Sequence, residues 1–174
     1  RQWHAQPPNS LLDNSPLVGL LHRMLDLPRL DEVIGHGVLD ALAVSASSYT
    51  AGRHVIFYQA RDPIKPWSRA LRMSVQQQIG VDHLLASSAI PLIFPAVPLY
   101  CDGRCEYFGD GAMRELAPLS PAIHLGADKL LVIGAGFFWR ITTGRAKRVS
   151  EGTQIDLARL GATKNGKFVA GIGG

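Results

Sequence analysis

The chain has 174 residues, of which 47% are hydrophobic and 18% charged, and its net charge is +4. This composition suits one globular domain with a sizeable core and excludes a disordered, collagen-like or disulfide-rich protein. The small positive excess is far from the basic footprint of a nucleic-acid-binding protein, so we expect no nucleic-acid partner. No apolar run approaches the roughly 20 residues that span a bilayer, which predicts no transmembrane helix.

The first residues do not form a signal peptide, because no apolar stretch follows Arg1. The chain begins without Met, so we expect it to be a piece of a longer protein that is cytoplasmic or peripheral to a membrane. Cys101 and Cys105 flank an expected turn. A disulfide between them stays open, although so few thiols are typical of a reducing compartment. No His/Cys pair repeats at ligand spacing, so we expect no metal and no other cofactor.

The first half of the chain predicts two helices and two strands. Ser15 is expected to cap a helix with Pro16 in its first turn, and apolar residues then recur at helical spacing until Pro28. A weaker helical stretch covers 30–34. The short apolar runs at 41–44 and 55–58, joined by a Ser/Thr/Gly-rich connection, are typical of strands buried on both faces.

In the second half, apolar residues recur every fourth position from Trp67 to Ile79, which predicts a helix that begins near Pro66. A short helix is expected over 82–90, and its small residues favour close packing. The Asp102-Gly103 pair predicts a hairpin over 100–108.

A helix over 116–126 and a buried strand over 129–134 are expected to follow the hairpin. This alternation of strands and helices predicts an α/β fold with a mostly parallel sheet. The segment 137–174 is basic and Gly-rich, and we interpret it as a diverged or truncated tail.

The block from Ala86 to Gly134 combines several motifs in a fixed order. It contains Ala86-Ser87-Ser88-Ala89-Ile90-Pro91, Phe94-Pro95, the hairpin, Asp110-Gly111-Ala112, and Gly126-Ala127 before the last strand. This order resembles the patatin-like phospholipase family of serine acylhydrolases, over roughly residues 10–136. The resemblance implies that 1–136 is the C-terminal part of a three-layer patatin-like domain whose nucleophile half lies outside the chain.

In that family the Asp of the D-G-[GA] triplet pairs with a serine in G-x-S-x-G, and the two form a Ser–Asp dyad without histidine. The resemblance assigns the catalytic role to Asp110, with Gly111 and Ala112 completing the motif. A serine hydroxyl needs a positioned base to remove its proton, and a carboxylate within hydrogen-bond reach serves this purpose. Taken alone, Asp-Gly indicates only a turn. The whole block favours the dyad.

No G-x-S-x-G and no Gly-rich oxyanion segment occurs in the 174 residues. Ser47, Ser48, Ser87 and Ser88 do not lie between glycines, so we expect them to serve in turns and helix packing. The isolated chain should therefore be inert, whereas the intact protein should hydrolyse acyl esters of phospholipids or other lipids. The alternatives are a non-catalytic patatin-like module that binds lipid or a protein, and a gene fragment that aggregates.

Three weaker signals remain. Gly134-Ala135-Gly136 follows a strand but lacks the rest of a dinucleotide fingerprint. His124 is a candidate for the histidine of a catalytic triad. A role in helix packing suits this residue better, and a Ser–Asp dyad needs no histidine. The basic stretch 140–148 attracts anionic headgroups only weakly, so a solvated loop competes with peripheral membrane contact. The sequence does not indicate the oligomeric state.

Overall fold

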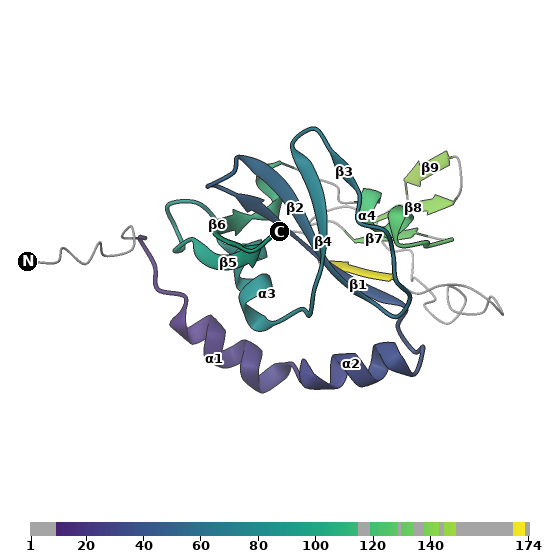
Figure 1. Ribbon diagram of the computed structural model, residues 1–174, viewed down its shortest axis with the longest axis horizontal. Coiled ribbons are helices and arrows are strands. Elements are labelled where there is room, and N and C mark those ends of the chain that lie inside the picture. The colour runs from purple at the N-terminus through teal and green to yellow at the C-terminus, as the bar shows by residue number, and fades with distance from the viewer. Residues whose placement is uncertain are drawn as a thin grey trace, which may run out of the picture.

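The protein has a mixed α/β architecture in a computed structural model that describes residues 10–114, 119–128, 130–133, 138–142, 145–148 and 169–172. The main sheet has the strand order β3-β4-β2-β1-β6-β5, and β10 lies beside β1 (Figure 1). Its strands are β1 Ala41–Ser48, β2 Arg53–Ala60, β3 Ser68–Arg69, β4 Arg72–Gln76, β5 Val97–Cys101, β6 Arg104–Asp110 and β10 Val169–Ile172. A smaller sheet holds β7 Leu130–Ile133, β8 Phe138–Thr142 and β9 Arg145–Arg148. The helices are α1 Ser15–Met24, α2 Pro28–Gly35, α3 Val81–Ser88 and α4 Leu119–His124, with a 3₁₀ turn, η1, at Gly111–Met113.

The centre of the main sheet is β1, in which every residue is buried. One edge of β1 pairs with β2 along its whole length. The other edge is shared, because β10 pairs with its first half and β6 with its last three residues. The predicted strands at 41–44 and 55–58 are confirmed, and the run of small and apolar residues explains why β1 tolerates cover on both faces.

The expectation of a mostly parallel sheet is wrong. Only the β2–β4 and β1–β10 pairs are parallel, whereas β1–β2, β1–β6, β3–β4 and β5–β6 are antiparallel. The connections explain the difference. Only residues 49–52 separate β1 from β2, and a parallel pair needs a crossover of about a dozen residues or more. The predicted hairpin at Asp102-Gly103 is confirmed as the β5–β6 turn.

The helix predicted from Pro66 to Ile79 is also wrong, because this segment forms β3 and β4. Leu71 lies at the turn between them with a positive φ of 61°. β4 pairs with β2, and its Met73 and Val75 pack on the core while Ser74 faces the other way. The edge of β2 supplies backbone hydrogen-bond partners that a helix could not use, and this tertiary pairing overrides the four-residue spacing.

The predicted helices at the start of the chain and over 82–90 are confirmed as α1, α2 and α3. The cap of α1 differs from the expected one, since Asp13 accepts hydrogen bonds from the Ser15 backbone and hydroxyl while Ser15 opens the helix. α4 and β7 confirm the later helix and strand in part, because residues 115–118 lie outside the described segments. Within the tail, β8 and β9 form strands and β10 joins the main sheet.

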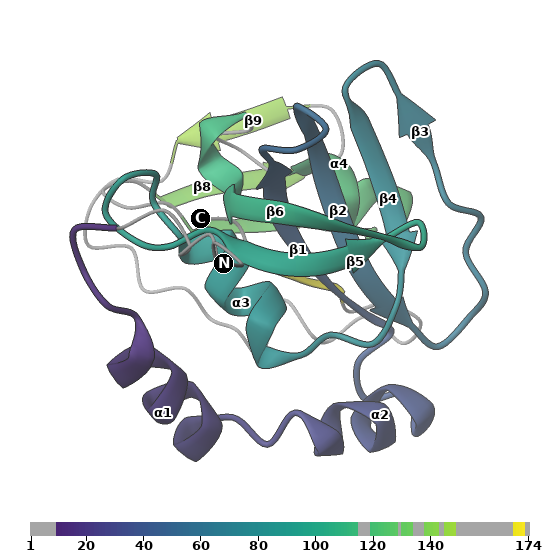
Figure 2. The same cartoon turned by 60° about the vertical axis from the view of Figure 1, so that its left-hand side comes forward.

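Two apolar clusters cover the two faces of the main sheet. On one of these faces α3 lies against β1, β5 and β6 (Figure 2). The larger cluster contains Phe57 and Phe108 and packs against Leu85 and Ala86 of α3. The small residues of α3 allow this close approach, as the sequence predicts. On the other face Tyr58 stacks on Trp67, which in turn stacks on His124 with a centroid distance of 4.6 Å. His124 therefore has a packing contact in α4.

A buried ion pair joins the β1–β2 hairpin to β6. Arg53 donates to the Glu106 carboxylate at 2.7 Å, and Ser48 donates to the other carboxylate oxygen at 2.7 Å. The nearby Cys101 is buried and Cys105 is exposed, and both are free thiols. In the described segments no helix is long and apolar enough to cross a bilayer.

Candidate functional site

Asp110 is the last residue of β6 and lies opposite Ala46 in the middle of the main sheet. Its backbone N–H donates to the Ala89 carbonyl at the end of α3, at 2.9 Å. The chain turns directly after Asp110 into η1. Asp110 is therefore fixed at the meeting point of a central strand, a helix end and a 3₁₀ turn, all of which belong to the best-packed part of the molecule.

The Asp110 carboxylate is half-buried, and one of its oxygens accepts a hydrogen bond from the Ala112 backbone N–H at 2.8 Å. Within the segments that the structure describes, the carboxylate forms no ion pair. A single backbone contact orients the group and leaves its second oxygen available to another donor. This arrangement suits a base that receives a proton from a neighbouring hydroxyl.

Neither glycine beside Asp110 has a positive φ, and close packing against backbone requires a glycine at Gly111. A Cβ atom on Gly111 would lie 2.5 Å from the backbone oxygen of Ser45 in β1. A Cβ atom on Gly109 would lie 1.8 Å from the Tyr49 hydroxyl. The group that leaves no room for a side chain at position 111 is therefore the backbone of β1.

Substituting Gly111 with alanine should lower the free energy of unfolding by about 1–3 kcal/mol, since either β1 or η1 must move to admit the methyl group. Chemical denaturation measures this change. Gly19→Ala in α1 is the matched control because a Cβ atom there meets nothing within 4 Å. This control should leave stability unchanged or raise it slightly. Equal stabilities of the two variants would contradict the packing role of Gly111.

Tyr49 is the neighbour of Asp110 that the sequence did not identify. Its side chain lies over Gly109, and its hydroxyl contacts the Met113 sulfur at 3.8 Å. Partial burial and, to a smaller extent, the negative charge of Asp110 raise the pKa of the Tyr49 phenol above its ordinary value. The hydroxyl therefore stays protonated at neutral pH. The only trace in the sequence is Gly109, a glycine inside a strand, which indicates the close approach of another group.

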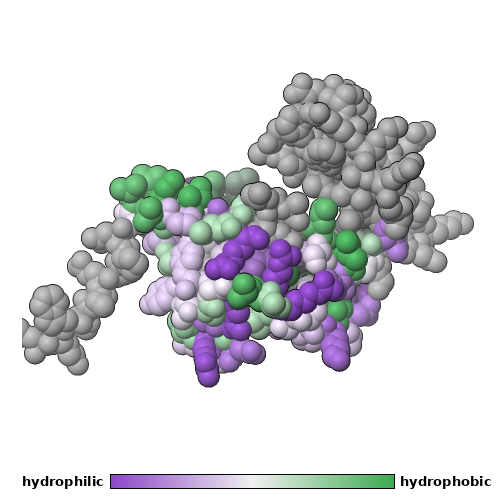
Figure 3. Space-filling view, turned by 90° about the horizontal axis from the view of Figure 1, so that it is seen from above, coloured by the Kyte–Doolittle hydropathy of each residue, from purple (hydrophilic) through white to green (hydrophobic). Residues whose placement is uncertain are grey.

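Four exposed aliphatic residues, Leu11, Leu12, Ile90 and Leu92, form an exposed aliphatic cluster on two segments that backbone hydrogen bonds join. Ile90 directly follows Ala89, whose carbonyl accepts from the Asp110 N–H. The Leu11 and Leu12 backbone N–H groups donate to the carbonyls of Leu92 and Ile93, at 2.9 and 2.8 Å. Leu11 and Leu92 are 81% and 82% exposed, and Leu92 has a positive φ of 68°. Figure 3 shows apolar side chains gathered at this edge, at the upper left of the view.

The four serines considered as substitute nucleophiles have other environments. Ser47 and Ser87 are each 1% exposed. The Ser48 hydroxyl donates to Glu106 and accepts from the Ala51 N–H, and the Ser88 hydroxyl donates to the Leu84 carbonyl in its own helix. Each of the four is therefore either enclosed or already bonded.

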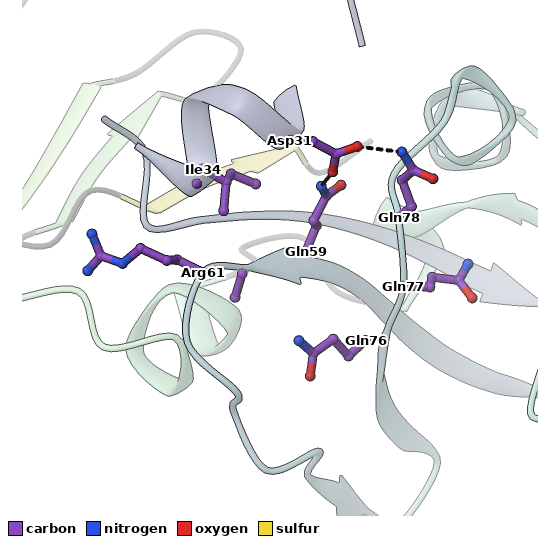
Figure 4. A pocket seen from close by; sticks show the side chains of 9 residues that line it. Asp31, Ile34, Gln59, Arg61, Gln76, Gln77 and Gln78 are labelled. Atoms are coloured by element: carbon purple, nitrogen blue, oxygen red, sulfur yellow. Dashed lines mark hydrogen bonds between the residues drawn. The ribbon is translucent and has the colours of Figure 1, made fainter. Parts of the chain in front are cut away.

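A cavity with a volume of about 520 Å³ lies between α2 and the ends of β2 and β4, and Asp110 does not line it (Figure 4). Asp31 of α2 accepts hydrogen bonds from Gln59 and Gln78 across it. Gln59 in turn accepts from the Ile79 N–H at 3.0 Å. These hydrogen bonds fasten α2 to β2 and to the segment that follows β4.

In the parts of the chain described by the structure, no group of three or more His, Cys, Asp or Glu side chains could hold a metal ion. Comparisons with protein-family models, with curated proteins and with solved structures found no match for this chain.

Proposed function

We propose that the intact protein hydrolyses acyl esters of phospholipids or related lipids through a Ser–Asp dyad. This chain supplies Asp110, and the serine of a G-x-S-x-G elbow comes from a segment outside the 174 residues. The proposal includes a three-layer patatin-like domain, of which the mixed sheet, α3 and α4 form part.

The observation that carries the proposal is the state of the Asp110 carboxylate. It is half-buried, held by the Ala112 N–H at 2.8 Å, and without an ion pair among the described residues. Gly111, directly after Asp110, packs against the backbone of β1, so the carboxylate is held at the end of a central strand. The exposed aliphatic cluster beside Ala89 favours a lipid over a polar ester as the substrate.

The chemistry follows from a carboxylate base. Asp110 accepts the serine proton as the serine oxygen attacks the ester carbonyl carbon, and it then returns the proton to the departing alcohol. An acyl-serine remains. Asp110 next accepts a proton from water as the water attacks the acyl group. It returns this proton to the serine oxygen as the bond from carbon to that oxygen breaks, which releases the fatty acid and the free serine. No step requires a metal.

The rival function is a non-catalytic module that binds lipid or a protein partner. The absence of G-x-S-x-G from the sequence of this chain favours it, whereas the arrangement around Asp110 favours the enzyme. A fluorophosphonate probe distinguishes the two, because it labels only serines that an adjacent base has activated.

We expect the probe to label the full-length gene product at a serine outside these 174 residues and to leave the isolated chain unlabelled. Mass spectrometry of the labelled peptide identifies the serine. A full-length protein that is folded, unlabelled and inactive towards lipid esters would rule out the enzyme and leave the binding module.

A further inference from the structure

The turn that follows α3 fixes one half of the exposed aliphatic cluster. The Ile90 carbonyl accepts hydrogen bonds from the Ile93 and Phe94 N–H groups, at 3.2 and 2.9 Å, and this closes a tight turn that carries Leu92. Phe94 packs against the larger apolar cluster of the core. The segment before α1 is bonded to the same turn, because the Leu11 N–H donates to the Leu92 carbonyl at 2.9 Å. The exposed aliphatic cluster is therefore part of the folded structure and not the end of a free loop.

The exposed aliphatic cluster faces solvent as a group, which distinguishes it from a single exposed leucine. Leu11 and Leu92 are 81% and 82% exposed, and Figure 3 shows the apolar patch at this edge of the molecule. Leu71 is also an exposed leucine, but it stands in the β3–β4 turn, at the edge of the main sheet opposite to β5. Single exposed apolar residues are normal on protein surfaces, whereas a gathered patch marks a site of contact with a protein or a membrane.

The surroundings of the exposed aliphatic cluster favour an apolar partner over a charged one. No residue from Leu84 to Cys101 carries a formal charge. Asp13 directly follows Leu12, and its carboxylate accepts hydrogen bonds from the Ser15 N–H and hydroxyl at 3.0 and 2.7 Å. The cluster therefore offers a partner hydrophobic contact and no basic side chain that would select an anionic one.

The size and shape of the exposed aliphatic cluster favour a lipid surface over a protein. Together its four residues expose on the order of 400 Å², about half of the 800 Å² or so that each partner of a stable protein complex buries. Leu11 and Leu92 are so fully exposed that they project from the surface instead of lining a hollow that a partner side chain could fill. Projecting aliphatic side chains enter the acyl boundary of a bilayer without a matching pocket.

We propose that the exposed aliphatic cluster inserts into the surface of a phospholipid bilayer and holds the Asp110 end of β6 against it. This inference rests on the proposed function, because it names the surface from which the lipid ester is taken. Ile90 directly follows Ala89, whose carbonyl accepts from the Asp110 N–H at 2.9 Å. Insertion of Ile90 and Leu92 therefore brings the candidate base close to the lipid surface. The contact is hydrophobic, so added salt should not weaken it.

The experiment measures sedimentation of the full-length protein with phosphatidylcholine vesicles. These vesicles carry no net charge, which excludes any attraction of the basic stretch 140–148 to anionic headgroups. For the double variant Leu11→Gln/Leu92→Gln we expect the partition coefficient to fall about 10- to 100-fold, with an unchanged unfolding transition. Leu71→Gln is the matched control, since Leu71 is 66% exposed and, like Leu92, has a positive φ. It should bind the vesicles as wild type does.

Equal binding of the double variant and wild type would overturn the inference, as would a wild type that does not bind these vesicles. A loss of binding that comes with a lower unfolding temperature would show that the leucines pack against another part of the protein, and would also overturn it.

Hydrolysis of a water-soluble ester, p-nitrophenyl butyrate, separates this inference from the proposed function. The double variant should hydrolyse it within about twofold of wild type, because a dissolved ester needs no bilayer contact. If wild type hydrolyses this ester but does not bind vesicles, the dyad stands and the docking surface is wrong. If wild type binds vesicles through the leucines but hydrolyses no ester, the docking surface stands and the proposed hydrolase function is overturned.

Discussion

Asp110→Asn in the full-length protein should lower kcat for lipid ester hydrolysis by about 10²–10⁴-fold, the range typical for loss of a general base. The asparagine keeps a side-chain oxygen that accepts the Ala112 N–H, so the turn at η1 should stay intact. What it loses is the second carboxylate oxygen as a proton acceptor. Steady-state kinetics on a phospholipid substrate, with the unfolding transition measured alongside, separates the loss of chemistry from a loss of structure.

The matched control for Asp110→Asn is Asp102→Asn, in the turn of the β5–β6 hairpin. Asp102 also precedes a glycine, but it lies in the exposed β5–β6 turn with a φ of 55°. Asparagine tolerates this left-handed conformation, so both activity and stability should stay near wild type. Activity near wild type in Asp110→Asn, or an equal loss in the two variants, would remove Asp110 from the mechanism.

Arg53→Met should lower the free energy of unfolding by about 3 kcal/mol. The substitution leaves the buried Glu106 carboxylate with only the Ser48 hydroxyl as a described partner. The side chain of Arg53 is 29% exposed and that of Glu106 is 6% exposed. Water can therefore reach part of the site, which keeps the effect at the lower end of the range for a broken buried pair. Denaturant titration measures the change.

Two further variants test the cause of this loss. Arg61→Met removes the more exposed ion pair with Asp40, and we expect it to cost about 1 kcal/mol or less. Arg53→Met combined with Glu106→Leu removes the stranded charge and should recover much of the lost stability. A double variant as unstable as Arg53→Met alone would show that Arg53 acts through the packing of its aliphatic stem and not through its charge.

Local chemistry was sufficient for a large part of the fold. Pro16 and the apolar spacing of 17–25 place α1, and the Asp102-Gly103 pair places the β5–β6 turn. Strands β1 and β2 were predicted because their residues are apolar and small over short runs. In each case the deciding interactions lie within a few residues of one another along the chain, so the sequence contains them directly.

Part of the candidate site was also available from the sequence. The resemblance of the motifs to those of a known family led to Asp110, Gly111 and Ala112, and the structure describes the packing and the hydrogen bond that hold the carboxylate. The position of Tyr49 could not be predicted from the sequence, because only the pairing of β1 with β6 brings this residue over Gly109. A contact between residues 60 positions apart leaves no periodic pattern in the sequence.

The sequence by itself determined which segments are helical at the start of the chain and where the hairpin turns. Only the tertiary structure decided that 66–79 forms β3 and β4 and that the sheet is mostly antiparallel. The physical reason is the same for both. The direction and pairing of a strand depend on which edge is free to hydrogen-bond with it, and that edge is made by residues far away in the chain.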